Sequence, residues 1–114
     1  MAACDDKFHE ECGVFAIYDR NRPAALETYY GIFSLQHRGQ ESAGITVSDG
    51  HTMETFRGMG LVTEVFRKLP EKGGFIGIGH VRYSTTGSSI PSNIQPLQLE
   101  GAEGPLALAT NGSL

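Results

Sequence analysis

The stretch that decides the fold is Cys12-Gly13-Val14-Phe15-Ala16-Ile17-Tyr18. Its side chains are largely apolar on both faces of an alternating pattern, which is typical of a strand buried on two sides. The sequence therefore predicts a central strand here. Eleven residues precede Cys12, and a cut after Glu11 would give one residue both a thiol nucleophile and a free α-amine.

An N-terminal cysteine combines a nucleophile with its own base. The α-amine titrates near ~7.7–8.0 and the thiol near ~8.5, so at neutral pH the amine can accept the thiol proton. In the uncut chain the same nitrogen is an amide without basicity, and the intact precursor is expected to be inactive. The alternative is a small buried cysteine at the start of a strand, because free cysteine is among the most buried residue types.

Hydrophobic periodicity predicts the elements that follow. A helix is expected over about residues 23–37, and a short one over residues 61–69. The apolar stripe of the first helix is Leu26, Tyr29, Tyr30 and Phe33. Strands are expected over residues 43–48, 52–57, 75–83, 95–99 and 106–109, with a polar loop over 84–96. Asp49-Gly50 predicts a hairpin with a type I′ turn, and the whole pattern favours an α+β fold.

Composition limits the partners of the chain. Its 114 residues allow one domain at most, and a net charge of −4 without a basic patch favours neither nucleic acid nor a membrane. Cys4 and Cys12 are too few for a disulfide framework, and no segment approaches the ~20 apolar residues of a membrane span. The acidic residues before Cys12 do not fit a secretory signal, so the expected location is the cytoplasm.

Three further polar segments each have an ordinary structural explanation. Residues 37–42, His-Arg-Gly-Gln-Glu-Ser, follow the first helix, where basic residues pair favourably with the helix dipole. Arg82 could bind a substrate carboxylate through two hydrogen bonds, or it could form a surface salt bridge. Asn111-Gly112 could be a simple turn, or it could supply two N–H donors to an oxyanion.

Together, in this order and spacing, these segments closely resemble the glutaminase domain of the amidophosphoribosyltransferase family. The matching segments are Cys12-Gly13, residues 35–45 (LQHRGQESAGI), residues 79–85 (GHVRYST), residues 93–97 (NIQPL) and Asn111-Gly112. The resemblance implies an α+β fold of the N-terminal-nucleophile hydrolase type, with two stacked antiparallel sheets between helices (αββα), incomplete in this chain. It also implies a propeptide over residues 1–11 and the truncated N-terminal part of a type 2 glutamine amidotransferase domain over residues 12–114, without the phosphoribosyltransferase domain.

The resemblance implies the catalytic roles as well. Cys12 would be the nucleophile that forms a glutamyl thioester, and Asn111 with Gly112 would form the oxyanion hole. The family usually has histidine before the Asn-Gly pair, whereas this chain has Thr110. Threonine lacks the ring and its second hydrogen-bonding nitrogen, which leaves the packing of the oxyanion hole open.

Substrate binding is implied for two other residues, and a supporting role for two more. Arg82 would bind the glutamine carboxylate with support from Thr85, and Arg38 with Gly39 would form the turn beside the nucleophile. Enzymes of the family pass ammonia to a second domain, where it replaces the pyrophosphate of phosphoribosyl pyrophosphate to give phosphoribosylamine. No cofactor is expected within these residues; Mg²⁺, and in some relatives a 4Fe-4S cluster, belong to the absent part. A homo-oligomer is expected at full length, and the isolated 114-residue piece is expected to be inactive.

Three interpretations stay open at this point. The first is an amidophosphoribosyltransferase. The second is another class II glutamine amidotransferase, of the glucosamine-phosphate or asparagine synthetase type, which normally begins with Met-Cys. The third is a catalytically silent binding or regulatory module, suggested by Thr110 and by the early end of the sequence. A product assay separates the first two, and labelling of Cys12 by a glutamine-like electrophile tests the third.

Overall fold

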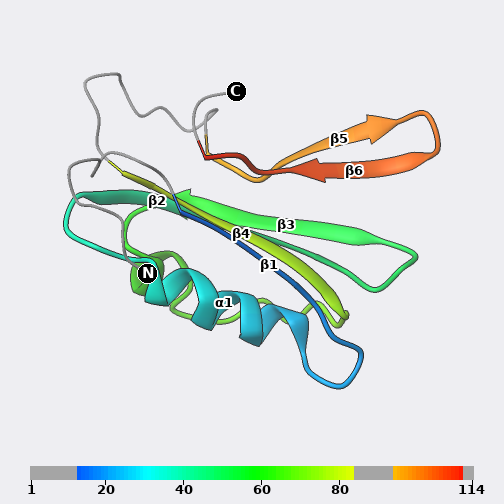
Figure 1. Cartoon of the computed structure of the whole chain (residues 1–114), viewed down its shortest axis with the longest axis horizontal. Coiled ribbons are helices and arrows are strands. Elements are labelled where there is room, and N and C mark those ends of the chain that lie inside the picture. The colour runs from blue at the N-terminus through cyan, green and yellow to red at the C-terminus, as the bar shows by residue number, and fades with distance from the viewer. Residues whose placement is uncertain (1–12, 84–93, 112–114) are drawn as a thin grey trace.

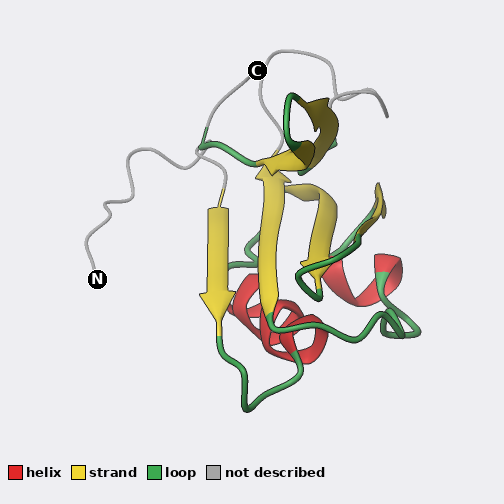
Figure 2. Cartoon of the chain, turned by 90° about the vertical axis from the view of Figure 1, so that its right-hand side faces the viewer, coloured by secondary structure: helices red, strands yellow, loops and turns green. Residues whose placement is uncertain are grey.

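The computed structural model describes residues 13–83 and 94–111. Four antiparallel strands form one sheet in the order β1-β4-β2-β3, and a hairpin forms a second sheet. The strands are β1 (Gly13–Tyr18), β2 (Gln40–Ser48), β3 (Met53–Met59), β4 (Ile76–Tyr83), β5 (Leu97–Gly101) and β6 (Gly104–Leu108), and the helices are α1 (Ala24–Ser34) and α2 (Val62–Val65). The larger sheet separates α1 from the β5-β6 hairpin (Figure 1), and the view in Figure 2 shows the same layering. The predicted α+β class with antiparallel sheets is confirmed.

β1 lies at an edge of the four-stranded sheet as far as the structure describes the chain, so the prediction of a central strand was wrong. Phe15 and Ile17 pack against the core on the α1 side. On the other face, Val14 is 41% exposed and Tyr18 is 63% exposed. The hairpin contacts β3, where the Thr55 hydroxyl donates to Gln98 of β5. The most buried strands are β2 and β4. Apolar side chains on both faces therefore do not require a central position.

α1 packs on the sheet mainly through small side chains and Ile32, and of the predicted stripe only Tyr29 packs against the core. Its buried residues are Ala24, Ala25, Thr28, Gly31 and Ile32. Tyr30 and Phe33 are exposed. A Cβ on Gly31 would lie 2.4 Å from the Phe15 ring, and one on Gly79 would lie 2.5 Å from Ile32. These close approaches explain why helix and sheet both present glycine at their contact. The helix also ends at Ser34, three residues before its predicted end.

The β2–β3 hairpin is confirmed, but its turn is not type I′. Ser48 pairs with Met53, which leaves a four-residue loop from Asp49 to Thr52. A type I′ turn needs positive φ at both central residues, whereas Gly50 has φ 92° and no non-glycine residue of the described chain has positive φ. The Asp49 carboxylate accepts hydrogen bonds from the Thr52 and His51 amides, both at 2.8 Å. These bonds hold the loop and lower the pKa of Asp49.

The remaining predictions hold with shifted bounds. α2 spans four residues where residues 61–69 were expected. β4 matches the predicted strand over 75–83 closely. The strands expected at 95–99 and 106–109 are β5 and β6, which pair with each other. β5 lies two residues later than expected, and β6 begins two residues earlier and ends one residue earlier. Residues 84–93 of the predicted loop lie outside the described residues, whereas residues 94–96 are buried. Among the described helices, none is long and apolar enough to cross a membrane.

Candidate active site

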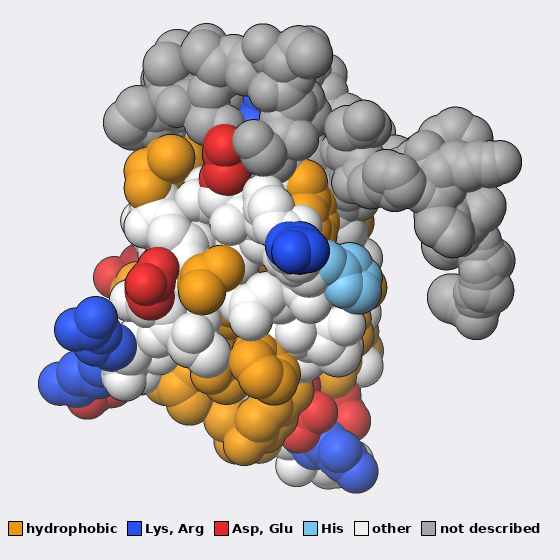
Figure 3. Space-filling view, turned by 90° about the vertical axis from the view of Figure 1, so that its left-hand side faces the viewer, with side chains coloured by type: hydrophobic (Ala, Val, Ile, Leu, Met, Phe, Trp, Pro, Cys, Tyr) orange, Lys and Arg blue, Asp and Glu red, His pale blue; other side chains and the backbone are white. Residues whose placement is uncertain are grey.

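One end of the four-stranded sheet brings together segments that lie far apart in the sequence. β1 begins at Gly13, opposite Val81 of β4, and β2 begins at Gln40, opposite Tyr83. Arg82 lies between Val81 and Tyr83 and therefore belongs to the same end. Figure 3 views the molecule from this side and shows a histidine and a basic side chain next to each other, with hydrophobic side chains gathered over α1. Three predicted site residues, Cys12, Thr85 and Gly112, lie outside the described residues.

Gly13, the residue that follows Cys12, has no room for a side chain. A Cβ at this position would lie 2.9 Å from Val81 and 3.0 Å from Leu35. The carbonyl of Leu35 in turn accepts a hydrogen bond from the Tyr83 hydroxyl, which fastens the end of α1 to β4. The Cys-Gly pair thus has a packing reason: only glycine lets the start of β1 lie this close to β4 and to the residue after α1.

The turn that contains Arg38 and Gly39 lies next to this end of the sheet. The Gln40 amide donates to the His37 carbonyl at 3.1 Å, and Gly39 has φ 91°, a conformation that favours glycine. The His37 ring lies 6.0 Å from the Tyr83 ring, measured between centroids. Arg38 and Gly39 are exposed. The structure therefore brings this turn to the end of β4, and the role of its two central residues stays a prediction.

Arg82 is a buried cation at this end of the sheet. Its side chain is 8% exposed, and its Nε finds no hydrogen-bond partner among the described residues. Ser42, its neighbour on β2, is 1% exposed, and its hydroxyl also lacks a partner there. A buried charge is costly unless it is paired and hydrogen-bonded, so this donor favours an anionic ligand such as a carboxylate.

His80 lies on the same face of β4 as Arg82, and no role for it was predicted. It is fully buried, and its Nε2 lies 3.1 Å from the Thr110 carbonyl oxygen. A carbonyl only accepts, so Nε2 carries the proton and donates. Burial lowers the pKa of His80 from 6.5 to about 4; the bond to Thr110 opposes this shift and the Arg82 charge adds to it. The imidazole is therefore neutral at pH 7. Its position two residues before Arg82 in a strand was the available signal.

Gln95 holds the other side of Thr110. The Thr110 amide donates to Gln95 Oε1 at 2.7 Å, and Gln95 is 2% exposed. We call these two contacts, His80 to the Thr110 carbonyl and Gln95 to the Thr110 amide, the Thr110 clamp. Both involve main-chain atoms of Thr110, so neither depends on its side chain, and the threonine found in place of the usual histidine leaves them intact. Asn111, the described half of the predicted oxyanion hole, is the next residue along the chain.

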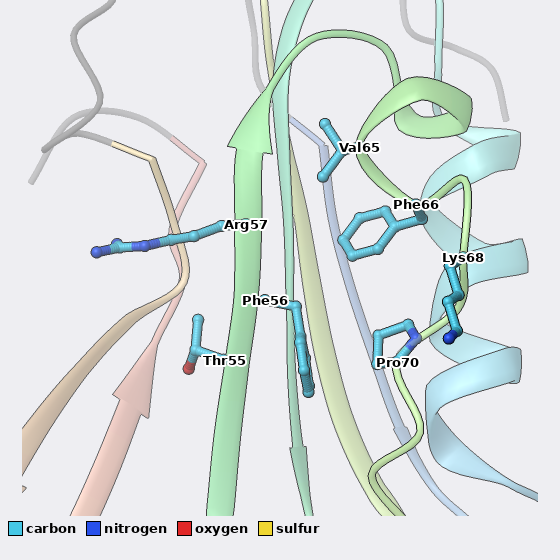
Figure 4. A pocket seen from close by; sticks show the side chains of 7 residues that line it. All are labelled: Thr55, Phe56, Arg57, Val65, Phe66, Lys68 and Pro70. Carbon is cyan, nitrogen blue, oxygen red and sulfur yellow. The ribbon is translucent and has the colours of Figure 1, made fainter.

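A cavity of about 320 Å³ lies elsewhere, at the β3 edge of the sheet. Figure 4 shows Phe56 and Phe66 on one side of β3, with Thr55 and Arg57 pointing to the opposite side. None of the predicted site residues that the structure describes lines this cavity, so it is not the candidate site. Within residues 13–83 and 94–111, no group of three His, Cys, Asp or Glu side chains could hold a metal ion.

Comparison with known proteins places these residues in a wider context. No family model matches the chain. The amidophosphoribosyltransferase of Synechocystis sp. is 53% identical over 111 residues, which is 96% of this chain and 22% of the relative. The Methanocaldococcus jannaschii enzyme of the same name is 50% identical over 106 residues, or 90% of this chain and 22% of the relative. In Bacillus subtilis the enzyme of that name is 49% identical over 109 residues, or 93% of this chain and 23% of the relative.

Solved structures agree with the sequence comparison. A structure described as the allosteric regulatory enzyme of purine biosynthesis has a TM-score of 0.73 and 46% identity, over 82% of this chain and 21% of that one. Glutamine phosphoribosylpyrophosphate amidotransferase from B. subtilis, complexed with ADP and GMP, has a TM-score of 0.70 and 46% identity, over 84% of this chain and 21% of that one. The chain thus spans about one fifth of the length of these relatives. Its resemblance to the amidophosphoribosyltransferases, predicted from five short segments, is confirmed over nearly all of its residues.

Proposed function

We propose that this chain is the N-terminal part of the glutaminase region of an amidophosphoribosyltransferase, built on an N-terminal-nucleophile fold. The observation that carries the proposal is the 53% identity over 96% of the chain. The geometry supports it, because the start of β1 directly after Cys12, the buried Arg82 and the clamp next to Asn111 all belong to one end of the sheet. The relatives named above favour this reading over the other classes of amidotransferase.

Removal of residues 1–11 would make Cys12 the first residue. Its α-amine then takes the thiol proton, and the thiolate attacks the side-chain amide carbon of glutamine. The carbon–sulfur bond forms while the carbonyl electron pair moves to oxygen, and this oxyanion is stabilised by N–H donors of Asn111 and Gly112. When the tetrahedral intermediate collapses, the electron pair on oxygen re-forms the carbonyl and the carbon–nitrogen bond breaks. The nitrogen takes the proton held by the α-amine and leaves as ammonia. Water then hydrolyses the thioester and releases glutamate.

Arg82 supplies the binding energy for the substrate carboxylate. Its low exposure, and an Nε without a partner within residues 13–83 and 94–111, suit a carboxylate that excludes water from the guanidinium. Thr85 would support this contact, and the turn with Arg38 and Gly39 would flank the nucleophile. In the full-length protein, the ammonia would displace pyrophosphate from phosphoribosyl pyrophosphate to give 5-phosphoribosylamine, the first step of purine biosynthesis.

The test uses the full-length protein and compares Cys12 with Cys4, which lies within residues 1–11. Cys12→Ser is expected to abolish ammonia release from glutamine, whereas the matched control Cys4→Ser should leave it unchanged. Mass spectrometry of the mature protein should show that residues 1–11 are absent. Formation of phosphoribosylamine from phosphoribosyl pyrophosphate and free ammonia should survive Cys12→Ser, because that step does not use the thiol.

Two results would overturn the proposal. One is a Cys12→Ser protein that still releases ammonia from glutamine, which would remove the thioester step. The other is an active mature protein that still carries Met1 to Glu11, because its Cys12 nitrogen would be an amide and could not act as the base.

A further inference from the structure

The main chain of Thr110 is held from both sides by buried side chains that come from different elements. His80 reaches it from the central strand β4, and Gln95 reaches it from the segment before β5. These residues are 30 and 15 positions away from Thr110 in the sequence, so the clamp is a tertiary feature. It fixes both the carbonyl and the amide of the residue that immediately precedes Asn111.

The segment that carries Gln95 is itself fixed to the sheet. The Arg57 side chain donates to the carbonyl oxygens of Ile94 and Pro96. The Gln95 carbonyl lies so close to β2 that a Cβ on Gly44 would be 2.1 Å away. Gln95 is thus a rigid support, because its backbone cannot shift toward the sheet and its neighbours are tied by Arg57.

We infer that His80 and Gln95 are positioning residues for glutamine hydrolysis: they fix the Thr110 main chain and thereby aim Asn111 at the oxyanion. The inference rests on the function proposed above, in which Asn111 donates to that oxyanion. An oxyanion donor acts only when it is held about 2.7–3.1 Å from the place where the charge develops. Loss of one side of the clamp lets Asn111 turn away, which weakens transition-state stabilisation and leaves substrate binding by Arg82 in place.

The hydrogen bond to the Thr110 carbonyl needs a proton on Nε2 of His80. Burial keeps the ring neutral, and a neutral ring with its proton on Nε2 can still make this bond. A glutamine side chain in place of His80 can present an N–H at a similar position, whereas leucine fills the space without a donor. His80→Gln and His80→Leu therefore separate the hydrogen bond from the packing.

The experiment measures glutamine hydrolysis by the full-length protein. His80→Leu and Gln95→Met should each lower kcat by about 10- to 100-fold, less than the ~100- to 1000-fold loss typical of removing an oxyanion donor itself. The KM for glutamine should stay within about twofold, the pattern of an interaction made in the transition state. His80→Gln should restore kcat to within about fivefold of the natural protein, and the double variant should lose little more than either single one.

Gln98→Met is the matched control for Gln95→Met. Gln98 lies three residues further on, in β5, and accepts a hydrogen bond from the Thr55 hydroxyl at 2.6 Å; among the described residues its side chain is not part of the Thr110 clamp. Its replacement loosens the contact between the sheets without altering the clamp, so kcat should stay near that of the natural protein. A fall in kcat equal to that of Gln95→Met would reduce the effect to general loosening and overturn the inference.

Two chemical probes of Cys12 separate orientation from nucleophilicity. An aldehyde analogue of glutamine forms a carbon–sulfur bond with the thiolate while its carbonyl pair becomes an oxyanion; its affinity should fall in His80→Leu by the same factor as kcat. Iodoacetamide transfers its carbon to sulfur and expels iodide without forming an oxyanion, so its rate of reaction with Cys12 should not change. The positioning role would be refuted if His80→Leu lowered the affinity for the aldehyde and the rate with iodoacetamide by the same factor. An unchanged kcat in His80→Leu would refute it as well.

These results are distinguishable from failure of the proposed function. If Cys12→Ser is inactive and His80→Leu hydrolyses glutamine normally, only the positioning role is refuted. Ammonia release that survives Cys12→Ser refutes both, because no thiol-derived oxyanion then exists for Asn111 to stabilise.

Discussion

Replacement of Gly44 by alanine should detach the second sheet from the first. The added Cβ would lie 2.1 Å from the Gln95 carbonyl oxygen, 2.9 Å from Pro96 Cδ and 3.0 Å from the Arg57 Cβ, whereas ordinary contact begins near 3.4 Å. The nearest of these atoms is main chain, so no side-chain rotation relieves the contact. Overpacking of this kind costs about 1–3 kcal/mol, and we expect the upper end because the backbone must move.

A smaller, stabilising effect of alanine opposes this overpacking cost. Alanine restricts the unfolded chain and gains about 0.4–1 kcal/mol, so the net loss should be about 2 kcal/mol in the opening free energy of residues 94–111. That corresponds to about 30-fold faster amide hydrogen exchange. Mass spectrometry of exchange in the full-length protein, on peptides that cover β5 and β6, measures it directly.

Gly58→Ala provides the matched control on the neighbouring strand β3. Its Cβ would meet Val65 side-chain atoms at 3.4 and 3.7 Å, which is ordinary contact. This variant should exchange like the natural protein or slightly more slowly. Equal exchange rates in Gly44→Ala and Gly58→Ala would refute the reasoning, because they would show that the Gln95 carbonyl does not lie against β2.

Three further predictions concern the site and the helix beneath it. His80 should titrate with a pKa near 4 in an NMR titration of histidine-labelled protein. In the unfolded chain its pKa is near 6.5, so the unfolded chain binds that proton more tightly, and the free energy of unfolding should fall by about 3 kcal/mol as pH drops from 6.5 to 4. His80→Gln should remove this part of the pH dependence. A His80 signal that titrates near 6.5 would contradict the buried, neutral ring. Arg82→Ala should raise the KM for glutamine by about 10- to 100-fold, the effect of losing a charge-assisted bond of about 1.5–3 kcal/mol, and Arg82→Lys should recover only part of it; an unchanged glutamine dependence would remove Arg82 from carboxylate binding. Gly79→Ala should lower the thermal midpoint, because its Cβ would lie 2.5 Å from Ile32 and 2.8 Å from Thr28, whereas Gly73→Ala, with nothing within 4 Å, should not; equal midpoints would argue against the close seat of α1.

The sequence was a good guide wherever local chemistry decides the structure. The hairpin around Asp49 and the strand that ends at Tyr83 follow from alternation and turn residues. The turn type did not follow, because the Asp49 carboxylate makes its own hydrogen bonds to the loop. Local pattern could not tell which neighbour would cover each face of β1, since Val14 and Tyr18 are as apolar as core residues.

Long-range contacts were the part that periodicity could not predict. Tyr30 and Phe33 fitted the spacing of a buried helix face, yet both are exposed. Gly31 of α1 lies against Phe15 of β1, and Gly79 of β4 lies against α1, and these close approaches favour small residues on the buried face of the helix. The site residues were predicted from a resemblance to a family. Arg82 is buried, and its Nε has no hydrogen-bond partner among the described residues. His80 and Gln95 escaped notice because their importance depends on Thr110, which folding brings to them from the far end of the chain.

Both hydrogen bonds to Thr110 use its main chain, so they place no requirement on its side chain. Thr110 can exchange its side chain while the peptide groups on either side keep their bonds to His80 and Gln95. The selective constraint therefore falls on the two partners and not on the position between them. In a search of related sequences, variability at the site of Thr110 would then be no sign of lost chemistry, whereas a change at either partner would be.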